Sequence, residues 1–549
     1  MSAHVDQPAP APATPEEGRG APPAGLSERA LRAAAAASGV VAVLAFLAAS
    51  ELVAIVVGPA GSPLFAVGQL AIDLAPAPVK DAMVAAFGTG DKLALGVIMV
   101  VLLLAVASGA GVLELHRRPL GSVVIGIGGL IALGAVLTRA GAGPVDGVPT
   151  AVGTLVAIRL LPALVRRLRR WDSAARPGWA GEEVEPPLRG PGVERRAFLT
   201  WTLVAGAAAL VAGTGARVVN AAAQAVTDLR DRLVLPRPAV AADAVPAGAS
   251  LDVDGITPYV TPAEDFYRID TALQVPAVDP ATWRLRVHGL VDREVEIGFD
   301  ELLALPLVEH HATLSCVSNE VGGDLIGTAL WLGYPIRDLL ARAGVRAGAD
   351  MVLSTSVDGF TAGTPLDVLQ DEGTQALLAV GMNGAPLPVE HGFPVRMVVP
   401  GLFGYVSATK WVASLEVTRF ADAEGYWTPR GWDALGPVKL ESRIDVPRAG
   451  AALTAGEEVA IAGVAWEPHV GVSRVEVRVD DGEWTEAELA DSVSADTWRQ
   501  WVLRWTATPG DHELAVRATN ADGETQGEAE LPPAPNGAEG WHRVRVSVS

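Results

Sequence analysis

The chain has a single cysteine, Cys316, in a setting where its sulfur could take part in chemistry. It follows two adjacent histidines, His310 and His311, in the stretch HHATLSCVSNEVGG. The run ATLSCV resembles a β-strand and leads into a polar, glycine-rich turn, so the sulfur is expected at a strand end. Three functional interpretations are open: a nucleophile paired with a nearby histidine, a redox-sensing thiol, and a soft thiolate ligand to a metal. A buried structural cysteine is the common non-functional alternative.

Because there is only one cysteine, an intramolecular disulfide and zinc or iron–sulfur sites of the CxxC type are excluded. Two later stretches, MNGAPLPVEHGFPVR and VVPGLFGYVSATKW, are rich in Gly, Asn and His. Their connections could hold an anionic cofactor. The second stretch carries Lys410, one of only four lysines in the chain, which is an independent indication of a specific role.

Residues 251–425 resemble the molybdopterin-binding domain of the sulfite oxidase family. The matching stretches follow the family's order and are TPAEDFYRIDTAL, WRLRVHGLVD, TLSCVSNEVGGDLIGTALWLGYPIRDLL, MNGAPLPVEHGFPVRMVVPG and TKW. Residues 426–549, which open YWTPRGWDALGPVKLESRI, are similar to that family's C-terminal immunoglobulin-like dimerisation domain. The resemblance implies an α+β domain that binds Mo-molybdopterin, an all-β sandwich after it, and a molybdenum-dependent oxidoreductase.

Carried over position by position, the resemblance makes Cys316 the protein thiolate on molybdenum, and so both the metal ligand and the catalytic residue. A soft sulfur suits a metal that a pterin dithiolene already holds. The family pattern implies eight cofactor-binding residues: Glu264, Tyr267, Arg268, Ser356, His391, Arg396, Ser407 and Lys410. Of these, His391 and Arg396 match holders of the pterin phosphate, and Ser407 and Lys410 complete the anion site. A surface salt bridge is the alternative interpretation of His391 and Arg396.

The chain departs from the family pattern where the substrate would bind. Sulfite oxidases follow the cysteine with a Gly-Asn-Arg-type turn, whereas Glu320 ends this turn and would repel a dianion. Phe360 aligns with the family's active-site tyrosine and cannot donate a hydrogen bond. We therefore expect oxygen-atom transfer on a small S- or N-oxo substrate. Sulfite oxidation is the alternative within the family, and a non-enzymatic surface protein that keeps the fold is the alternative outside it.

The N-terminal part of the chain indicates a membrane region. Half of the residues are apolar and only 19% are charged, an unusual composition for a purely soluble protein. The Pro- and Ala-rich composition of residues 1–28 predicts a disordered tail. The apolar composition of residues 29–220 predicts an α-helical membrane region. The five apolar stretches are Ala33–Val57, Leu93–Leu113, Leu120–Thr138, Val148–Val165 and Ala197–Val219. They lack the charged stripe of a soluble bundle, so five membrane spans are predicted.

Basic residues predict how these spans are oriented. The clusters at 116–118 and 166–170 place the N-terminus and both loops in the cytoplasm. Five crossings then put everything after 220 outside, behind a linker at 221–250. Arg195 and Arg196 precede Phe198 and Leu199 and resemble a twin-arginine export signal. The alternative is that they are two more inside-positive arginines.

Composition also limits the partners. A net charge of −21 makes nucleic acid an improbable partner. The sequence has no CxxCH motif for a c-type haem, and His116 is the only histidine near a predicted span, so bis-histidine ligation of a membrane b-type haem is excluded. Electrons would then pass to or from an unidentified partner, which is either a quinone or a carrier protein. Membrane lipid is a further expected partner. The C-terminal sandwich, which contains Trp466, Trp484, Trp498, Trp501 and Trp505, makes a homodimer one expectation.

Overall fold

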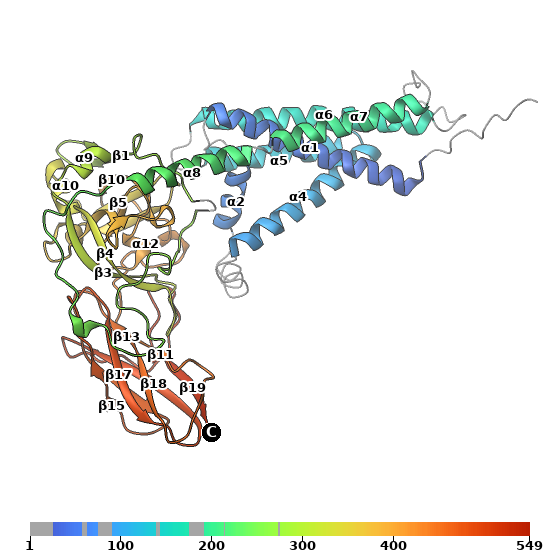
Figure 1. The fold of residues 1–549 in the computed structure, drawn as a ribbon. Helices are drawn as coiled ribbons and strands as arrows, with labels where there is room; N and C mark the ends of the chain where they lie inside the picture. The colour runs from blue at the N-terminus through green and yellow to red at the C-terminus, as the bar shows by residue number, and fades with distance from the viewer. Residues whose placement is uncertain are drawn as a thin grey trace, which may run out of the picture. The chain divides into compact units, whose positions relative to one another are not determined.

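A computed structural model describes residues 26–57, 63–74, 91–138, 143–174, 191–212, 215–272 and 275–549. The chain divides into two units, Met1–Ala216 and Arg217–Ser549. The first unit is helical, and the second contains one long helix followed by four sheets (Figure 1). Most of the predicted N-terminal tail lies outside the described residues.

The first unit is built from long apolar helices. They are α1 (Glu28–Val57), α2 (Pro63–Leu74), α4 (Asp91–His116), α5 (Leu120–Leu137), α6 (Val148–Ala174) and α7 (Pro191–Ala212). Small residues let helices approach closely: a Cβ added to Gly39 of α1 would lie 1.9 Å from the carbonyl oxygen of Ala107 in α4. Large apolar side chains point outward, such as Leu130, which is 68% exposed. An apolar outer surface of this kind suits lipid better than water.

Four stretches of the described residues are long and apolar enough to cross a membrane: Glu28–Ala54, Ala94–His116, Leu120–Leu137 and Pro144–Ser173. These four coincide with the first four predicted spans and suggest that the chain is associated with a membrane. The predicted fifth span, Ala197–Val219, covers part of α7, passes through residues outside the described part, and enters α8 (Gly215–Arg232). Helix α8 also occupies the start of the predicted linker. The fifth span stays a prediction.

The molybdopterin-like domain contains two sheets of mostly antiparallel strands. One sheet has the order β2-β1-β10-β5-β6 and the other β3-β4-β7-β8, with β9 on β7. Only β1 and β10 pair in parallel within them. The strands are β1 Arg284–Gly289, β2 Val295–Gly298, β3 Val308–Ser315, β4 Ile326–Pro335, β5 Met351–Ser356, β6 Thr361–Pro365, β7 Leu377–Met382, β8 Ala385–Pro386, β9 Arg396–Val398 and β10 Val412–Thr418. The helices are α9 Phe299–Leu303, α10 Ile336–Ala343, α11 Leu366–Gln370 and α12 Gly404–Ser407.

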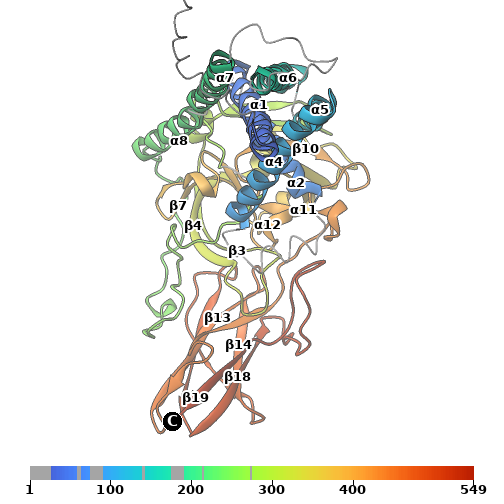
Figure 2. The same cartoon turned by 90° about the vertical axis from the view of Figure 1, so that its right-hand side faces the viewer.

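The C-terminal domain is the predicted β-sandwich, and its strands lie side by side in Figure 2. Its sheets have the orders β11-β13-β17-β16 and β12-β19-β18-β14-β15. The strands are β11 Glu441–Val446, β12 Ala452–Leu453, β13 Glu458–Trp466, β14 Val472–Val479, β15 Thr485–Glu486, β16 Glu488–Leu489, β17 Arg499–Thr506, β18 Gly510–Asn520 and β19 Arg543–Val548. Trp501 is fully buried between the sheets. The chain's one cysteine is free, so the apolar cluster that includes Trp501 holds the two sheets together without a disulfide.

The two domains of the second unit share one apolar core. Trp466 and Trp498 of the sandwich belong to the same buried cluster as Leu285 and Val287 of β1. The Trp498 indole N–H donates to the backbone oxygen of Tyr259 at 2.8 Å, across the domain boundary. The sandwich is therefore packed against the molybdopterin-like domain, and Arg443 of β11 donates to the Gly323 oxygen at 2.7 Å in the turn that follows Cys316.

Candidate functional site

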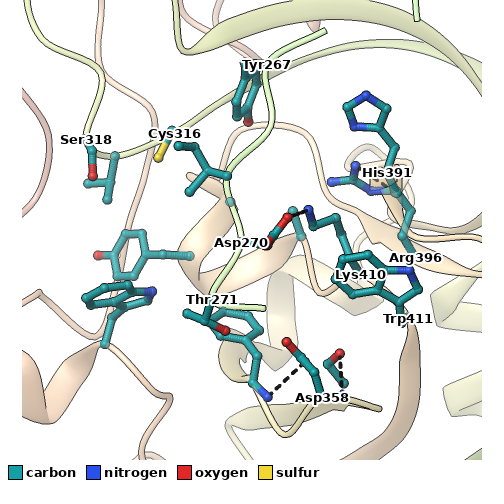
Figure 3. Close-up of a pocket in the computed structure, with 18 of the residues that line it drawn as sticks. Tyr267, Asp270, Thr271, Cys316, Ser318, Asp358, His391, Arg396, Lys410 and Trp411 are labelled. Atoms are coloured by element: carbon teal, nitrogen blue, oxygen red, sulfur yellow. Dashed lines mark hydrogen bonds and ion pairs between the residues drawn. The ribbon is translucent and has the colours of Figure 1, made fainter. Parts of the chain in front are cut away.

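A pocket in the second unit contains most of the predicted site residues. It is an open pocket with about 920 Å³ of space between its lining atoms, part of which is open to solvent. Its lining residues are Phe266, Tyr267, Ile269, Asp270, Thr271, Cys316, Val317, Ser318, Ser356, Asp358, Phe360, His391, Arg396, Gly404, Tyr405, Ala408, Lys410, Trp411, Trp427 and Trp432. Cys316 and Ser318 lie on one side, while His391, Arg396 and Lys410 lie on the other (Figure 3).

Cys316 directly follows β3, as the strand-end prediction requires. The turn after it is closed by backbone bonds, since the Cys316 N–H donates to the Leu325 oxygen at 2.9 Å and the Asn319 N–H donates to the Cys316 oxygen at 3.0 Å. Burial raises the pKa of the Cys316 thiol, although hydrogen bonds from the backbone and hydroxyl of Ser318 act in the opposite direction. The sulfur is thus a neutral thiol in the free protein, and a bound metal would favour the thiolate.

Arg396 is a buried cation that lacks an acidic partner. It begins β9, is 5% exposed, and its guanidinium lies 5.1 Å from the centre of the Trp331 ring. It donates only long bonds of 3.3 Å, to the backbone oxygens of Met397 and His391. Among the described residues no carboxylate forms an ion pair with it. Burial lowers its pKa to about 10, so it still carries its charge at neutral pH.

His391 lies next to Arg396 and is neutral. Its Nε2 lies 3.2 Å from the Ala263 oxygen, which can only accept, so this nitrogen carries the proton. Burial and the neighbouring charges of Arg396 and Lys410 lower the pKa of His391 to about 3. Gly392 has φ 111°, and an added Cβ would lie 2.9 Å from the Arg396 Cβ and 3.2 Å from the Lys410 Cβ. Glycine at this position therefore lets the three side chains converge.

Asp270 is a site residue that the sequence reasoning missed. Its Oδ2 lies 2.7 Å from Lys410 Nζ and 3.0 Å from Arg268 Nε, and its side chain is only 4% exposed. Lys410 also donates to the Glu390 oxygen at 3.0 Å. Burial lowers the pKa of Lys410 to about 8, although the ion pair with Asp270 raises it. An acidic residue within the quoted stretch FYRID was the available signal, but only the fold pairs it with Lys410.

Six of the nine predicted site residues line the pocket: Tyr267, Cys316, Ser356, His391, Arg396 and Lys410. The others do not. Glu264 and Arg268 are exposed, although Arg268 reaches Asp270 from outside. Ser407 is fully buried and its hydroxyl donates to the backbone oxygens of Leu402 and Phe403, while the next residue, Ala408, lines the pocket. Cofactor contacts of these three residues stay predictions.

The segment that joins the two domains contributes aromatic side chains that the sequence reasoning assigned to the sandwich. Trp427 and Trp432 line the pocket beside Tyr405. Backbone bonds hold the segment, since the Phe403 N–H donates to the Gly436 oxygen at 2.7 Å. The Tyr405 hydroxyl donates to the Asp433 oxygen at 2.8 Å, so its ring faces the pocket without a free donor. The predicted boundary at 425/426 therefore cuts through the site.

The charge distribution suits an anionic cofactor that brings its own metal. Among the described residues, no group of three or more His, Cys, Asp or Glu side chains could hold a metal ion. A metal at Cys316 would then rely on a cofactor for its other ligands. Opposite the sulfur, Lys410 and Arg268 share the carboxylate of Asp270, whereas Arg396 forms no ion pair with any of the described residues. A phosphate would neutralise this buried cation.

Known families and relatives agree with these features. Residues 272–427 match the family "Oxidoreductase molybdopterin binding domain", and residues 441–516 match "Bacterial Ig domain". The first match implies a molybdopterin cofactor. Mitochondrial sulfite oxidase of Mus musculus is 33% identical over 340 residues, which are 53% of this chain and 62% of that protein. The chain thus spans less than two thirds of the length of that relative.

Sulfite oxidase of Gallus gallus is 30% identical over 323 residues, which are 50% of this chain and 69% of that protein. A solved structure, the sulfane dehydrogenase SoxCD from Paracoccus pantotrophus, matches with a TM-score of 0.46 and 22% identity and covers 54% of this chain and 82% of that one. From the chicken enzyme and the molybdopterin-binding match, this chain belongs to the sulfite oxidase family.

Proposed function

We propose that the chain is a membrane-anchored, exported molybdenum-dependent oxidoreductase that transfers an oxygen atom on a small S- or N-oxo substrate. The observation that carries this proposal is the opposition of Cys316 to the buried Arg396 and Lys410 across one pocket (Figure 3). Bound there, molybdenum would supply oxygen-atom transfer by cycling between oxidation states. An unidentified quinone or carrier protein would exchange electrons with it.

Each residue then has a distinct task. Cys316 supplies a thiolate, and the hydrogen bonds from Ser318 favour its charged form. Arg396 and Lys410 hold the anionic end of the pterin, whereas neutral His391 has only an acceptor nitrogen left, which can accept a hydrogen bond from a pterin N–H but cannot bind a phosphate oxygen. Tyr267 stays protonated, because burial and the nearby Cys316 raise the pKa of its phenol. Its hydroxyl can therefore donate a hydrogen bond inside the pocket.

The substrate side favours a neutral oxo compound over sulfite. Phe360 lines the pocket where the family pattern has a tyrosine, and it offers neither a hydrogen bond nor a proton. Glu320 is exposed and does not line the pocket, so its predicted repulsion of a dianion acts at a distance and is weaker than a direct contact. Among the described residues that line the pocket, the basic side chains are Arg396 and Lys410, on the side opposite Cys316, and this placement is the stronger support for a neutral substrate.

The test compares the wild type with Cys316→Ala. We expect the wild type to hold about one molybdenum and to reduce sulfoxides or amine N-oxides with a reduced viologen as donor. The variant should lose more than about 100-fold in turnover while its pterin stays bound, because the metal loses its protein ligand. Efficient oxidation of sulfite, or molybdenum far below stoichiometric in cofactor-replete cells, would contradict the proposal. The second outcome would favour a non-enzymatic surface protein.

We also propose a cytoplasmic N-terminus and an extracytoplasmic catalytic domain. Both Arg195 and Arg196 are exposed near the start of α7, where an export receptor could read them. Changing both to lysine keeps the charge but removes the guanidinium pair. The catalytic domain of that variant should stay protected from protease added outside the cell. An exposed, molybdenum-loaded domain in the lysine variant would contradict the twin-arginine interpretation.

A further inference from the structure

Three arginines come together in the first unit, where α4, α5 and α6 meet. Arg118 lies in the short connection between α4 and α5, and Arg166 and Arg169 lie in the C-terminal part of α6. Burial lowers the pKa of Arg118, and so do the positive charges of Arg169 and Arg166, which are close enough to repel it. We call these three residues the arginine cluster.

The carboxylate beside the arginine cluster already has other partners. Glu114 of α4 is 1% exposed, and its charge acts on Arg118 against the repulsion. Its Oε2 accepts hydrogen bonds at the start of α5, from the Ser122 N–H at 3.0 Å and the Ser122 hydroxyl at 3.2 Å. One carboxylate cannot balance three guanidinium groups, so the arginine cluster keeps a net positive charge.

Two members of the arginine cluster have donors to spare. Arg169 donates to the backbone oxygen of Leu115, which joins α6 to the end of α4. Arg118 and Arg166 are exposed, and neither guanidinium has a hydrogen bond or ion pair to another of the described residues. A guanidinium is a planar fork of donors that matches the oxygens of a phosphate. The arginine cluster can therefore bind a phosphate from outside the chain.

Apolar surface begins directly after Arg118. Helix α5 exposes Leu120, Val123, Ile127 and Leu130, by 40% for the first and 68% for the last. Their spacing of three and four residues places them on one face of the helix, over a length of about 15 Å. A soluble phosphate would leave this face bare, whereas the acyl chain of a lipid would cover it.

Arg159 adds a second observation on α6. It lies within the apolar stretch Pro144–Ser173 and is exposed, as is Leu155 one turn before it. Arg159 precedes Arg166 by seven residues, so the two lie on the same face, about 10 Å apart along the helix. Its guanidinium also has no partner among the described residues. An arginine at this depth is costly unless its long side chain reaches toward a lipid phosphate.

We propose that the arginine cluster binds the phosphate of an anionic phospholipid, with one acyl chain along the exposed face of α5. Phosphatidylglycerol is the simplest ligand of this class. Phosphatidylcholine has the same phosphate, but the arginine cluster would repel its ammonium group. The site lies in the first unit alone, so it does not depend on the reaction proposed for the pocket.

Lipid selectivity can be measured on the full-length protein in a neutral detergent. Phosphatidylglycerol and phosphatidylcholine with the same acyl chains are added in equal amounts, and native mass spectrometry counts the lipids that stay bound. The wild type should retain phosphatidylglycerol at least about 10-fold more than phosphatidylcholine. Arg118→Gln and Arg166→Gln should each lower this preference about 3- to 10-fold. Arg166→Lys should lower it less, because lysine keeps the charge and loses only the fork.

Arg29→Gln is the matched control. Arg29 is an exposed arginine in the first turn of α1, so this variant loses one positive charge outside the arginine cluster. It should keep the wild-type preference. Equal retention of the two lipids by the wild type, or an equal loss of preference in Arg29→Gln and Arg118→Gln, would overturn the inference.

Two measurements on the wild type need no variant to fold. Added phosphatidylglycerol should raise the melting temperature more than added phosphatidylcholine does, because only a ligand of the folded state stabilises it. Glycerol 3-phosphate carries the phosphate without acyl chains, and in millimolar amounts it should leave the bound phosphatidylglycerol in place. Displacement by glycerol 3-phosphate would indicate a site for a soluble anion and overturn the assignment to a lipid.

Discussion

Two clusters of ionisable side chains in the second unit are each built around a buried aspartate, Asp496 in one and Asp270 in the other, and they differ in how their charge is balanced. At the domain interface, Asp496 of the sandwich accepts from His310 of β3 and from His469, each at 2.7 Å through a different oxygen. Burial alone would raise the pKa of Asp496, but these two bonds outweigh it and lower the pKa. The same bond from Asp496 raises the pKa of His469. Every charged atom of this interface cluster has a partner.

The pocket cluster is different. Arg396 has no carboxylate among the described residues, and Lys410 shares the single carboxylate of Asp270 with Arg268. A buried charge without a partner is costly, so a protein keeps one where a ligand supplies the missing charge. The comparison therefore separates a cluster that holds two domains together from one that is arranged for an anionic cofactor.

The largest effect that tests this difference is expected from Arg396→Met. Loss of this buried cation, which would face the cofactor phosphate, should weaken cofactor binding by about 2–5 kcal/mol, which corresponds to a roughly 30-fold or greater rise in Kd. The cofactor-free protein should be no less stable than the wild type, since an unpaired buried charge has been removed. Pterin fluorescence after dialysis and thermal unfolding measure the two quantities.

The matched control for this variant is Arg443→Met. Arg443 is 7% exposed, like Arg396, but its Nε lies 2.7 Å from the Asp445 carboxylate. Its loss should destabilise the cofactor-free protein. Because its guanidinium also donates to the Gly323 oxygen in the turn after Cys316 at 2.7 Å, some pterin should be lost, but less than in Arg396→Met. If both arginine variants retained the pterin equally well, the distinction between paired and unpaired cations would fail.

The part of the site that lies in short sequence motifs could be predicted. Cys316, His391 and Arg396 fall within stretches that match the family, and all three line the pocket. Asp270 was missed because its importance comes from a contact with Lys410, 140 positions later in the chain. The Ser407 hydroxyl turns to its own backbone, a rotamer choice that no motif specifies. Partners and rotamers depend on packing, which a motif does not describe.

The fold was predictable where a pattern is long or regular. Hydropathy located the four helices that could span a membrane, because each is a long apolar run. It did not locate α2, which is only 12 residues long, or α8, whose first half was taken as part of a span. Trp427 and Trp432 were assigned to the sandwich because a domain boundary taken from a family resemblance does not show which of the two domains the linking segment packs against.

A smaller effect is expected at the interface, from Asp496→Asn. The variant loses the charge that both histidines contact, and we expect the second unit to lose 1–2 kcal/mol of stability with its pterin content unchanged. Asp496 has a lowered pKa, so its contribution to the free energy of unfolding is fully present above its ordinary pKa of 3.8. His469 has a raised pKa, so its contribution is fully present below its ordinary pKa of 6.5 and is lost as the pH rises through the raised value. Urea unfolding at pH 5.5 should therefore show a larger difference than at pH 9. Loss of pterin in this variant would contradict a purely structural role.

The smallest and most specific effect is a shift in pH dependence caused by Asp270→Asn. In the wild type the Lys410 ammonium titrates at a pKa of about 8, below its ordinary 10.5, because burial lowers it more than Asp270 raises it. As the pH rises through 8, the free protein loses the charge that attracts the phosphate, and pterin affinity should fall. Between pH 8 and 10.5 the unfolded chain binds a proton that the folded chain does not, so the cofactor-free protein should become more stable over the same range.

Removing the Asp270 charge takes away the group that raises this pKa, so the fall in pterin affinity should begin about one pH unit lower. Retention of pterin after dialysis at pH values from 6 to 9.5 measures the midpoint in each protein. Lys410→Met is the control, because it should bind pterin weakly at every pH and show no midpoint in this range. An unchanged midpoint in Asp270→Asn would mean that Asp270 does not set the charge of Lys410, and that the pocket cluster depends on Arg396 alone.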